Sequence, residues 1–402
     1  MLLNIQVPPI YPSGYKIVFV GEAPGEEEVK QREGFVGAAG KCLQKASKVA
    51  GIEWNACGKS NVVKRRPFTN SNKFREAFYE TIEEPIYTKT GKLSKKTKKV
   101  EKPTLEYAQW VVELEREIRA QNPNLVVACG NEALTAITNY TGITDYRGSI
   151  LESKWKRESS GDCFKVLAVE HPSFILHGNP ERFWILARDL QKAKREMEFP
   201  EIKREPMDNR SKPEAVNFIL TELEYLEAYP EMKWTLDVET RAGTLACFAI
   251  AYRALGGPYH SFCIPIQTTS GPYWTVEEEF EIWRALDATA NSNGNLCNQN
   301  IEYDIDYLLR YGVEPSGVYM DTMLTHSILY PELPKDLGFL GSWYLDDVVW
   351  WKDDHRDWSG KTKDEALWEY CCKDAVYTLR IVEKIDEELK RRGMWEMYHG
   401  RN

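Results

Sequence analysis

The chain has 402 residues and a formal net charge of −9, and this length is sufficient for two domains that each bury their own core. No apolar run approaches the length that spans a bilayer and the first residues lack a signal-peptide pattern, so the sequence predicts a cytoplasmic protein without a membrane partner. The nine cysteines include no C-x-x-C pair, which argues against a disulfide framework or a zinc site and is typical of a reduced protein.

Charge is distributed unevenly along the chain. Residues 1–200 carry 31 Lys and Arg against 25 Asp and Glu, whereas the remainder carries 21 against 36. This asymmetry predicts two domains with different surfaces. An acidic domain can still act on DNA when some of its carboxylates hold metal ions.

The first domain is expected over residues 1–198, where short β-branched runs alternate with amphipathic stretches. Such alternation predicts an α/β domain with a mostly parallel sheet and helices on both faces. Strands are expected at 16–20, 61–64, 125–129 and 166–169. Helices are expected at 41–50, 105–120, 131–137 and 181–195.

A lysine-rich insertion lies between Glu84 and Thr104 of this domain. We interpret it as a solvated hairpin or loop, with a phosphate-contacting arm as the alternative. Its lysines are Lys89, Lys92, Lys95, Lys96, Lys98, Lys99 and Lys102.

Residues 199–212 are polar, contain two prolines and have no apolar period, which predicts an interdomain linker. The second domain is expected over 213–402. It begins with an amphipathic helix after Pro213, followed by a strand at 233–238. The apolar face of that helix consists of Ala215, Phe218, Ile219, Leu223 and Leu226.

Two acidic residues interrupt the hydrophobic strand sequence Trp234-Thr-Leu-Asp-Val-Glu-Thr240. Asp237 and Glu239 are two positions apart, so both side chains project from the same face. Adjacent buried carboxylates repel each other unless a cation neutralises them. The alternative, an exposed polar face of an edge strand, is less favoured because Leu236 and Val238 occupy the opposite face of a strand that opens a domain.

Two further acidic clusters follow. Asp304 is expected in the first turn of a helix that follows a short strand at 296–298. Taken alone, Asp304 is an ordinary charge at a helix N-terminus. Tyr370 and Asp374 are four residues apart on a later helix, so they share one helical face.

In order, these motifs read D-x-E, N-x-x-x-D and Y-x-x-x-D, which resembles the three exonuclease motifs of the tyrosine-bearing branch of the DEDD superfamily. The resemblance covers roughly 213–393, and the stretches at 321–324 and 331–340 look like those of phage-type family A DNA polymerases. It implies a ribonuclease-H-like α/β/α fold and a two-metal 3′→5′ DNA exonuclease that proofreads.

The resemblance also implies roles for individual residues. Two divalent ions roughly 4 Å apart stabilise the attacking and leaving oxygens during phosphodiester hydrolysis. Tyr370 would orient the attacking water, and Asn300 would touch the single-stranded 3′ end of the DNA. The ligands that the resemblance implies for two Mg²⁺ or Mn²⁺ ions are Asp237, Glu239, Asp304 and Asp374.

Four motifs of the first domain carry a second resemblance. They are Gly21-Glu-Ala-Pro-Gly25, Gly34-Phe-Val-Gly37, Asn61-Val-Val-Lys-Arg-Arg-Pro67 and His171-Pro-Ser173. In this order they resemble the family 4 branch of the uracil-DNA glycosylase superfamily, over most of residues 14–195.

This resemblance implies a pocket for a base that is flipped out of the stack. Phe35 would stack on a flipped pyrimidine and Asn61 would hydrogen-bond its edge. His171 would stabilise negative charge on the uracil oxygen, and the loop at 172–176 would press into the DNA. The residues implied for the pocket floor are Gly21, Glu22 and Gly25, with Ala23 where the best-known glycosylases place a water-activating Asp.

One departure from family 4 concerns its iron–sulfur cluster. Arg65 stands where those enzymes have a cluster cysteine, so we expect no iron–sulfur cluster here. Two interpretations of the domain remain open: a uracil-DNA glycosylase, or a module that only binds DNA or a flipped base.

A glycosylase-like domain followed by a proofreading exonuclease looks like the front of a large bacteriophage family A DNA polymerase. The sequence printed here reaches Asn402 without polymerase motifs. We therefore expect a polymerase domain in a longer chain or a separate polymerase as partner, in the host cytoplasm if a phage encodes it. A mainly DNA-binding, polymerase-associated subunit is the alternative to a nuclease.

Overall fold

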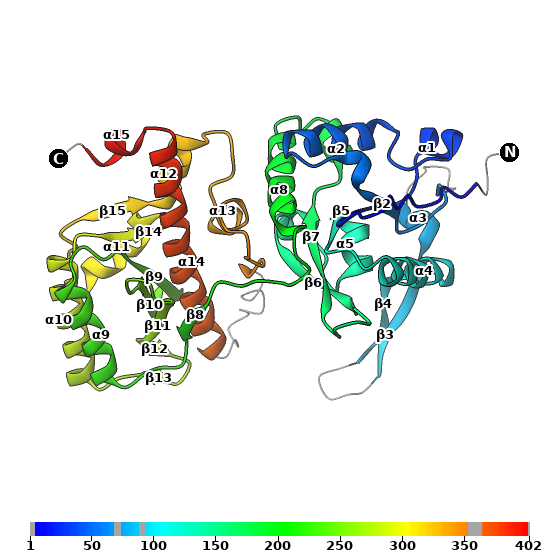
Figure 1. Cartoon of the computed structure of the whole chain (residues 1–402). Helices are drawn as coiled ribbons and strands as arrows, with labels where there is room; N and C mark the ends of the chain where they lie inside the picture. Colours follow the sequence, from blue (N-terminus) through cyan, green and yellow to red (C-terminus); the bar gives the residue numbers. More distant parts are fainter. Residues whose placement is uncertain (1–4, 68–73, 88–92, 353–363, 401–402) are drawn as a thin grey trace. The chain divides into compact units, whose positions relative to one another are not determined.

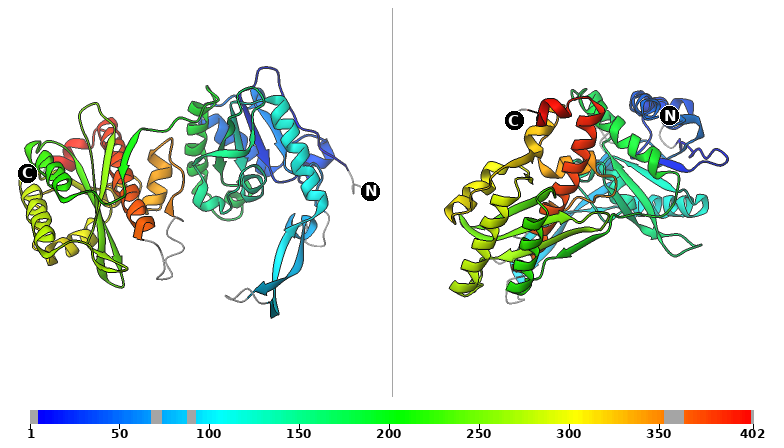
Figure 2. Two further views of the ribbon diagram at one scale, coloured as in Figure 1. Left: turned by 90° about the horizontal axis from the view of Figure 1, so that it is seen from below. Right: turned by 60° about the vertical axis from the view of Figure 1, so that its left-hand side comes forward.

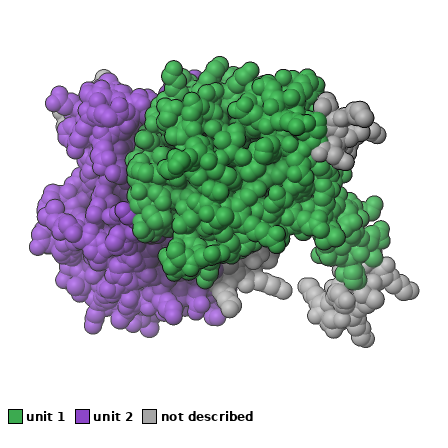
Figure 3. All heavy atoms as spheres, turned by 45° about the vertical axis from the view of Figure 1, so that its right-hand side comes forward, with its two compact units in different colours: residues 1–202 green, residues 203–402 purple. Residues whose placement is uncertain are grey.

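The computed structural model describes residues 5–67, 74–87, 93–352 and 364–400, without the side chains of 86–96 (Figure 1). The chain divides into two compact units, Met1–Ile202 and Lys203–Asn402, which are coloured separately in Figure 3. This division falls within the residues expected to form the linker. No helix among the described residues has both the length and the apolar character that crossing a bilayer requires.

Unit 1 is built on a five-stranded sheet in the order β2-β1-β5-β7-β6. The first four strands are parallel and β6 is antiparallel to β7. The predicted mostly parallel sheet is therefore confirmed. The strands are β1 (Ile17–Gly21), β2 (Gly58–Asn61), β5 (Leu125–Cys129), β6 (Ile150–Lys156) and β7 (Cys163–Val169).

The strand expected at 61–64 is wrong in its position, because the observed strand β2 covers Gly58–Asn61. The β-branched Val62 and Val63 suggested a strand, but pairing with β1 runs from Gly58 to Asn61 and ends there. Tertiary pairing thus overrides local β-propensity. As a consequence, Asn61 lies at the carboxyl end of its strand.

Helices cover both faces of this sheet (Figure 2). One core joins α2 and α8 to alternate strand residues such as Phe19 and Val127, and the intervening Val18 and Val126 are equally buried. The helices of unit 1 are α1 (Glu26–Gln31), α2 (Ala38–Val49), α3 (Phe74–Phe78), α4 (Leu105–Gln121), α5 (Asn131–Ile137), α6 (Ile143–Tyr146), α7 (Pro172–Leu176) and α8 (Arg182–Glu196), with a 3₁₀ turn at Trp54–Ala56.

The lysine-rich insertion is an antiparallel hairpin of β3 (Tyr79–Tyr87) and β4 (Leu93–Pro103). Acidic residues of β3 face basic residues of β4, and Lys98 and Lys102 both form ion pairs with Glu84. This internal neutralisation favours the solvated hairpin over a phosphate-contacting arm. Lys89 and Lys92, and the side chains of Lys95 and Lys96, lie outside the described residues.

Unit 2 is built on a six-stranded mixed sheet in the order β15-β14-β9-β10-β11-β8. Met207–Arg210, within the expected linker, forms β8 and pairs in parallel with β11. This short edge strand is polar, and its Asn209 accepts a hydrogen bond from Ser261 (2.8 Å), so no apolar period marks it. The other strands are β9 (Trp234–Arg241), β10 (Thr244–Arg253), β11 (Tyr259–Pro265), β14 (Leu296–Asn298) and β15 (Val318–Asp321), with a separate pair β12 (Gln267–Thr268) and β13 (Gly271–Pro272).

The sheet of unit 2 lies between two helical layers, which confirms the predicted α/β/α arrangement. Helices α9 and α10 pack with Leu236 and Ile250 on one face, and α14 covers Ala249 and Cys263 on the other. The helix expected after Pro213 is α9, although Ala215 is its exposed N-cap. The helices are α9 (Val216–Ala228), α10 (Val276–Ser292), α11 (Ile301–Arg310), α12 (Thr322–Leu329), α13 (Leu337–Tyr344), α14 (Asp364–Arg391) and α15 (Trp395–His399).

Candidate functional site

Three carboxylates of unit 2 meet where β9 faces α14. The side chains of Asp237, Glu239 and Asp374 each offer an oxygen within 4.8 Å of the others. Side chains alternate between the two faces of β9, which explains why Asp237 and Glu239 lie on the same face. Leu236 and Val238 are buried in the core on the opposite face. Helix α14 is held against β9 because the Thr235 hydroxyl donates to the backbone carbonyl of Ala375 at 2.8 Å.

Asp304 approaches this group from α11. It is 4% exposed, and its Oδ1 accepts a hydrogen bond from the backbone amide of Val238 at 2.9 Å. Asp321 fixes the start of α11, since it accepts from the Ile301 amide (2.9 Å) and also from the Met323 amide (2.8 Å) at the start of α12. The structure thus places Asp304 beside the β9 acids but outside the group of three.

Burial raises the pKa values of Asp237, Glu239 and Asp304 well above their ordinary range, and the mutual repulsion of neighbouring carboxylates raises them further. The Oδ2 atom of Asp237 is buried and has no hydrogen-bond partner among the described residues. A cation would satisfy this oxygen and relieve the repulsion. The donor set consists of carboxylate oxygens, which fits a hard divalent ion such as Mg²⁺ or Mn²⁺.

Tyr370 lies one helical turn before Asp374 on α14 and is 8% exposed. Burial and the surrounding carboxylates raise the pKa of Tyr370, so its hydroxyl remains protonated at neutral pH. Lys352 donates a hydrogen bond to this hydroxyl at 2.8 Å and also forms an ion pair with Asp374. Trp351 donates from Nε1 to the Oδ1 of Asp374 at 2.5 Å.

Sequence reasoning missed both Trp351 and Lys352. They belong to a Trp-Trp-Lys-Asp-Asp stretch that carries no periodicity or recognisable spacing. Their contacts arise from the fold, which brings the segment after α13 against α14.

Asn300 is the exposed N-cap of α11, with a left-handed backbone (φ 58°) that asparagine tolerates. Its backbone amide is hydrogen-bonded to Asp321 at 3.3 Å. This leaves the Asn300 side chain at the protein surface, one turn from Asp304.

In unit 1 the predicted pocket residues gather at the carboxyl ends of parallel strands, the edge where α/β sheets commonly bind ligands. Gly21 ends β1 and Asn61 ends the neighbouring β2. A Cβ atom on Gly21 would lie 2.4 Å from Asn61 Oδ1 and 3.3 Å from the Phe35 ring. Gly21, Phe35 and Asn61 are therefore brought together, and any side chain at position 21 would displace that of Asn61.

Phe35 and Asn61 each have an unusual setting. Phe35 has a positive φ of 63°, and its ring contacts Trp54 edge-on with centroids 6.0 Å apart. Such a backbone conformation is strained for a bulky residue. Asn61 is buried, and its side-chain amide forms no hydrogen bond with the described part of the chain.

The motif after β1 continues through Glu22, Ala23 and Gly25. Burial, together with the nearby Glu132, raises the pKa of Glu22 to about 7. Ala23 is half-buried, and Gly25 is the N-cap of α1, where its amide donates to Glu28 at 2.6 Å. Glu132 was not singled out from the sequence, although it follows the strand β5 and so lies at the same sheet edge.

His171 follows β7 and is the N-cap of α7. Its Nδ1 accepts a hydrogen bond from the Ser173 amide at 3.2 Å, and burial lowers its pKa to about 4. The ring is therefore neutral at pH 7 with its proton on Nε2. A Cβ on Gly130, at the end of β5, would lie 2.9 Å from that of His171. His171 thus lies at the same sheet edge as Gly21 and Asn61, against the end of β5, which separates β7 from β1.

Arg65, the residue expected to replace a cluster cysteine, forms a bidentate pair with Glu106 at 2.6 and 2.7 Å and covers the ring of Phe78. All nine cysteines are free thiols. The prediction that the protein binds no iron–sulfur cluster rests on the sequence alone.

Comparison with known proteins divides the chain in the same way. Residues 8–194 match the family described as the uracil DNA glycosylase superfamily, and residues 262–390 match the family described as 3'-5' exonuclease. The second match begins after the β9 acids.

Three relatives are type-4 uracil-DNA glycosylases. The protein of Archaeoglobus fulgidus is 32% identical over 168 residues, which cover 40% of this chain and 67% of the relative. That of Sulfurisphaera tokodaii is 31% identical over 188 residues (45% and 70%), and that of Thermotoga maritima is 30% identical over 182 residues (44% and 76%).

Two solved structures are also similar to the chain. One is a protein from Bifidobacterium adolescentis (13% identity, TM-score 0.34, 48% of this chain and 46% of that one). The other is described as the apo form of the nuclease (16% identity, TM-score 0.33, 48% and 86%). The chain thus spans about half the length of the Bifidobacterium protein.

Proposed function

We propose a function from the premise that this chain belongs to the uracil DNA glycosylase superfamily through its first half and carries a 3′-5′ exonuclease domain in its second. Its main activity is the metal-dependent removal of nucleotides from single-stranded 3′ ends of DNA. The observation that carries the proposal is the meeting of Asp237, Glu239 and Asp374, with a buried oxygen of Asp237 left without a partner.

Four side chains would hold two Mg²⁺ or Mn²⁺ ions. When bound, such ions stabilise charge on the attacking and the leaving oxygen of the phosphodiester. Asp237 is central because Asp374, Glu239 and Asp304 all lie close enough to raise its pKa. Asp304 would contribute from the start of α11, where the Val238 amide fixes its orientation.

Tyr370 and Asn300 would position the attacking water and the DNA strand. The protonated hydroxyl of Tyr370 would hydrogen-bond the attacking water, whose oxygen forms the new bond to phosphorus as the bond to the 3′ oxygen breaks. The exposed Asn300 would contact the DNA strand. Positioning of this kind contributes by orienting reactants that already lie close together.

We further propose that the exonuclease proofreads for a family A DNA polymerase, either as part of a longer chain or with a separate polymerase polypeptide. The support is the order of the D-x-E, N-x-x-x-D and Y-x-x-x-D motifs together with the stretches at 321–324 and 331–340. A phage origin, and a location in the host cytoplasm, belong to the same proposal.

For unit 1 we propose the binding of a flipped pyrimidine in DNA. The convergence of Gly21, Phe35 and Asn61 supports it, because a buried amide without a partner is costly and a base edge would satisfy it. A neutral His171 with Nε2–H could donate to an oxygen that gains negative charge, so cleavage of the glycosidic bond is the second candidate activity.

One assay tests both activities. The protein is incubated with 5′-labelled single-stranded DNA and Mg²⁺, with and without one uracil. Progressive shortening that excess EDTA stops is the expected result, and undiminished shortening in EDTA would contradict a metal-dependent nuclease. Alkali-sensitive breakage at the uracil position alone would identify glycosylase activity.

A further inference from the structure

We propose that Lys352 is a positioning residue of the exonuclease, acting through the hydroxyl of Tyr370. The proposal rests on the proposed nuclease function and adds a residue to it. Lys352 precedes α14 in the chain, outside all three acidic motifs, and only the fold brings it to them.

Among the described residues, the contacts of Lys352 lie within the site. Its Nζ lies 2.8 Å from the Tyr370 hydroxyl and 4.8 Å from the centre of the Tyr370 ring, and it forms an ion pair with Asp374. Its side chain is 19% exposed. A lysine that is mostly buried against both the proposed water-orienting group and a proposed metal ligand differs from a solvated surface lysine.

The chemistry of the ammonium group determines the direction of this hydrogen bond. Lysine carries three donors and no acceptor, so the oxygen of Tyr370 must accept. The hydrogen of the Tyr370 hydroxyl is therefore directed away from Lys352. The charged groups around that hydroxyl are Asp374, which is within hydrogen-bond reach, Glu239 and Asp237. In the proposed reaction the attacking water would lie among these carboxylates. Lys352 thus selects the hydroxyl orientation that can reach the water.

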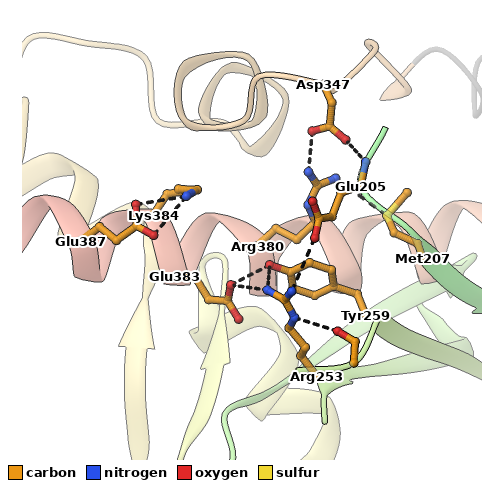
Figure 4. Close-up of polar contacts among 10 residues, drawn as sticks. Glu205, Met207, Arg253, Tyr259, Asp347, Arg380, Glu383, Lys384 and Glu387 are labelled. Atoms are coloured by element: carbon orange, nitrogen blue, oxygen red, sulfur yellow. Dashed lines mark hydrogen bonds and ion pairs between the residues drawn. The ribbon is translucent and has the colours of Figure 1, made fainter. Parts of the chain in front are cut away.

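The segment that carries Lys352 is anchored to α14 at two places. Asp347 forms an ion pair with the buried Arg380 and accepts from the backbone amide of Glu205 at 2.8 Å (Figure 4). Asp347 lies five residues before Lys352, so its ion pair with Arg380 holds this segment against the middle of α14. Next to Lys352, Trp351 donates to Asp374 and packs on Tyr377, with ring centroids 4.4 Å apart.

Further contacts surround the Asp347–Arg380 ion pair and Glu205. Arg253 of β10 contacts Glu383 at 3.4 Å and Glu205 at 3.5 Å, and the Tyr259 hydroxyl donates to Glu383 at 2.6 Å (Figure 4). These contacts tie β10, β11 and the start of unit 2 to the face of α14 that carries Arg380. The backbone of Lys352 is therefore positioned by the fold rather than by its own ion pair.

An alternative role for Lys352 would be simple neutralisation of Asp374. The two roles differ in what removal of the amine does. A neutralising lysine competes with metal, so Lys352→Met would tighten metal binding and leave kcat intact. A positioning lysine acts through Tyr370, so Lys352→Met would lower kcat, and would do so only when the Tyr370 hydroxyl is present.

The test is a double-mutant cycle on the full chain, with kcat and KM measured on labelled single-stranded DNA. Lys352→Met is expected to lower kcat about 10- to 100-fold with little change in KM, since orientation acts on the reacting complex. In the Tyr370→Phe background the same change should have no further effect. Lys352→Arg, which keeps a donor, should recover part of the activity. Lys384→Met is the control, because Lys384 is an exposed lysine on α14, the helix that carries Tyr370.

Two results would overturn the proposal: an unchanged kcat in Lys352→Met, or losses that multiply in the double variant. Thermal unfolding of each variant shows whether the fold is retained, and Lys352→Arg provides a second folded comparison if Lys352→Met is unstable. The wild-type rate in the same assay reports on the nuclease itself, so failure of that function is distinguishable from failure of the role of Lys352.

Discussion

The Oδ1 atom of Asp304 accepts a hydrogen bond from the backbone amide of Val238, which lies between Asp237 and Glu239 on β9. One peptide group of the strand thus positions a carboxylate of α11 beside two carboxylates of the strand itself. Acids that are more than sixty residues apart in sequence share one site because of this contact.

Asp237→Ala should lower the exonuclease rate about 100- to 1000-fold, because it removes a carboxylate that neighbours all three other proposed ligands and is worth several kcal/mol of transition-state stabilisation. The measurement is the initial rate on labelled single-stranded DNA at saturating Mg²⁺. Asp306→Ala, an exposed acid on α11 that pairs only with Arg310 in the described structure, serves as control and should retain the wild-type rate. Equal activity of the Asp237 variant and the wild type would refute the assignment.

Tyr370→Phe should lower kcat about 10- to 100-fold while DNA affinity stays nearly constant, because the hydroxyl acts on the water in the transition state. Single-turnover rates and equilibrium binding of DNA in Ca²⁺ separate the two quantities. A large rise in Kd together with a normal kcat would assign Tyr370 to DNA binding instead.

We predict that the free energy of unfolding depends on pH because of Glu22. Its pKa rises from 4.5 to about 7 on folding, so between these values the folded chain holds a proton that the unfolded chain has released. The free energy of unfolding therefore falls as pH rises through this window, by at most about 3 kcal/mol for a fully buried group. His171, with its pKa lowered from 6.5 to about 4, contributes in the opposite direction between those two values.

Because the two effects overlap, the measurement compares Glu22→Gln with the wild type. The variant lacks the titration, so its melting temperature relative to wild type should increase steadily from pH 4.5 to 7 and level off above. A difference in melting temperature that does not vary with pH would show that Glu22 titrates normally in the folded protein.

The pocket proposed for unit 1 predicts preferential binding of single strands that contain uracil over matched strands that contain thymine. Metal is withheld so that the exonuclease is silent. Phe35→Ala and Asn61→Ala should abolish the preference, since they remove the stacking ring and the amide. Gly21→Ala should act in the same direction, because its Cβ would displace Asn61.

Equal affinities of all these proteins for both strands would leave unit 1 as a general DNA-binding domain. Release of free uracil by the wild type, and its loss in His171→Ala, would establish glycosylase activity. Ser159→Ala, a change in the loop between β6 and β7 away from the strand ends of the pocket, is the matched control.

The sequence alone determined much of this protein because several of its signals are local. Period-two alternation placed Asp237 and Glu239 on one face of β9, and helical spacing placed Tyr370 and Asp374 on one face of α14. Strand and helix alternation predicted the parallel sheet of unit 1. These features depend on residues a few positions apart, for which backbone geometry leaves few choices.

Other features depended on residues far apart in the sequence. Pairing with β1 placed β2 at Gly58–Asn61 instead of 61–64, and pairing with β11 turned four residues of the expected linker into β8. Packing against α14 brought Lys352 to Tyr370, and the sheet edge brought Glu132 to Glu22. Sequence spacing carries no information about such contacts, because they form only when separate elements bury their apolar faces against each other and carry their polar residues along.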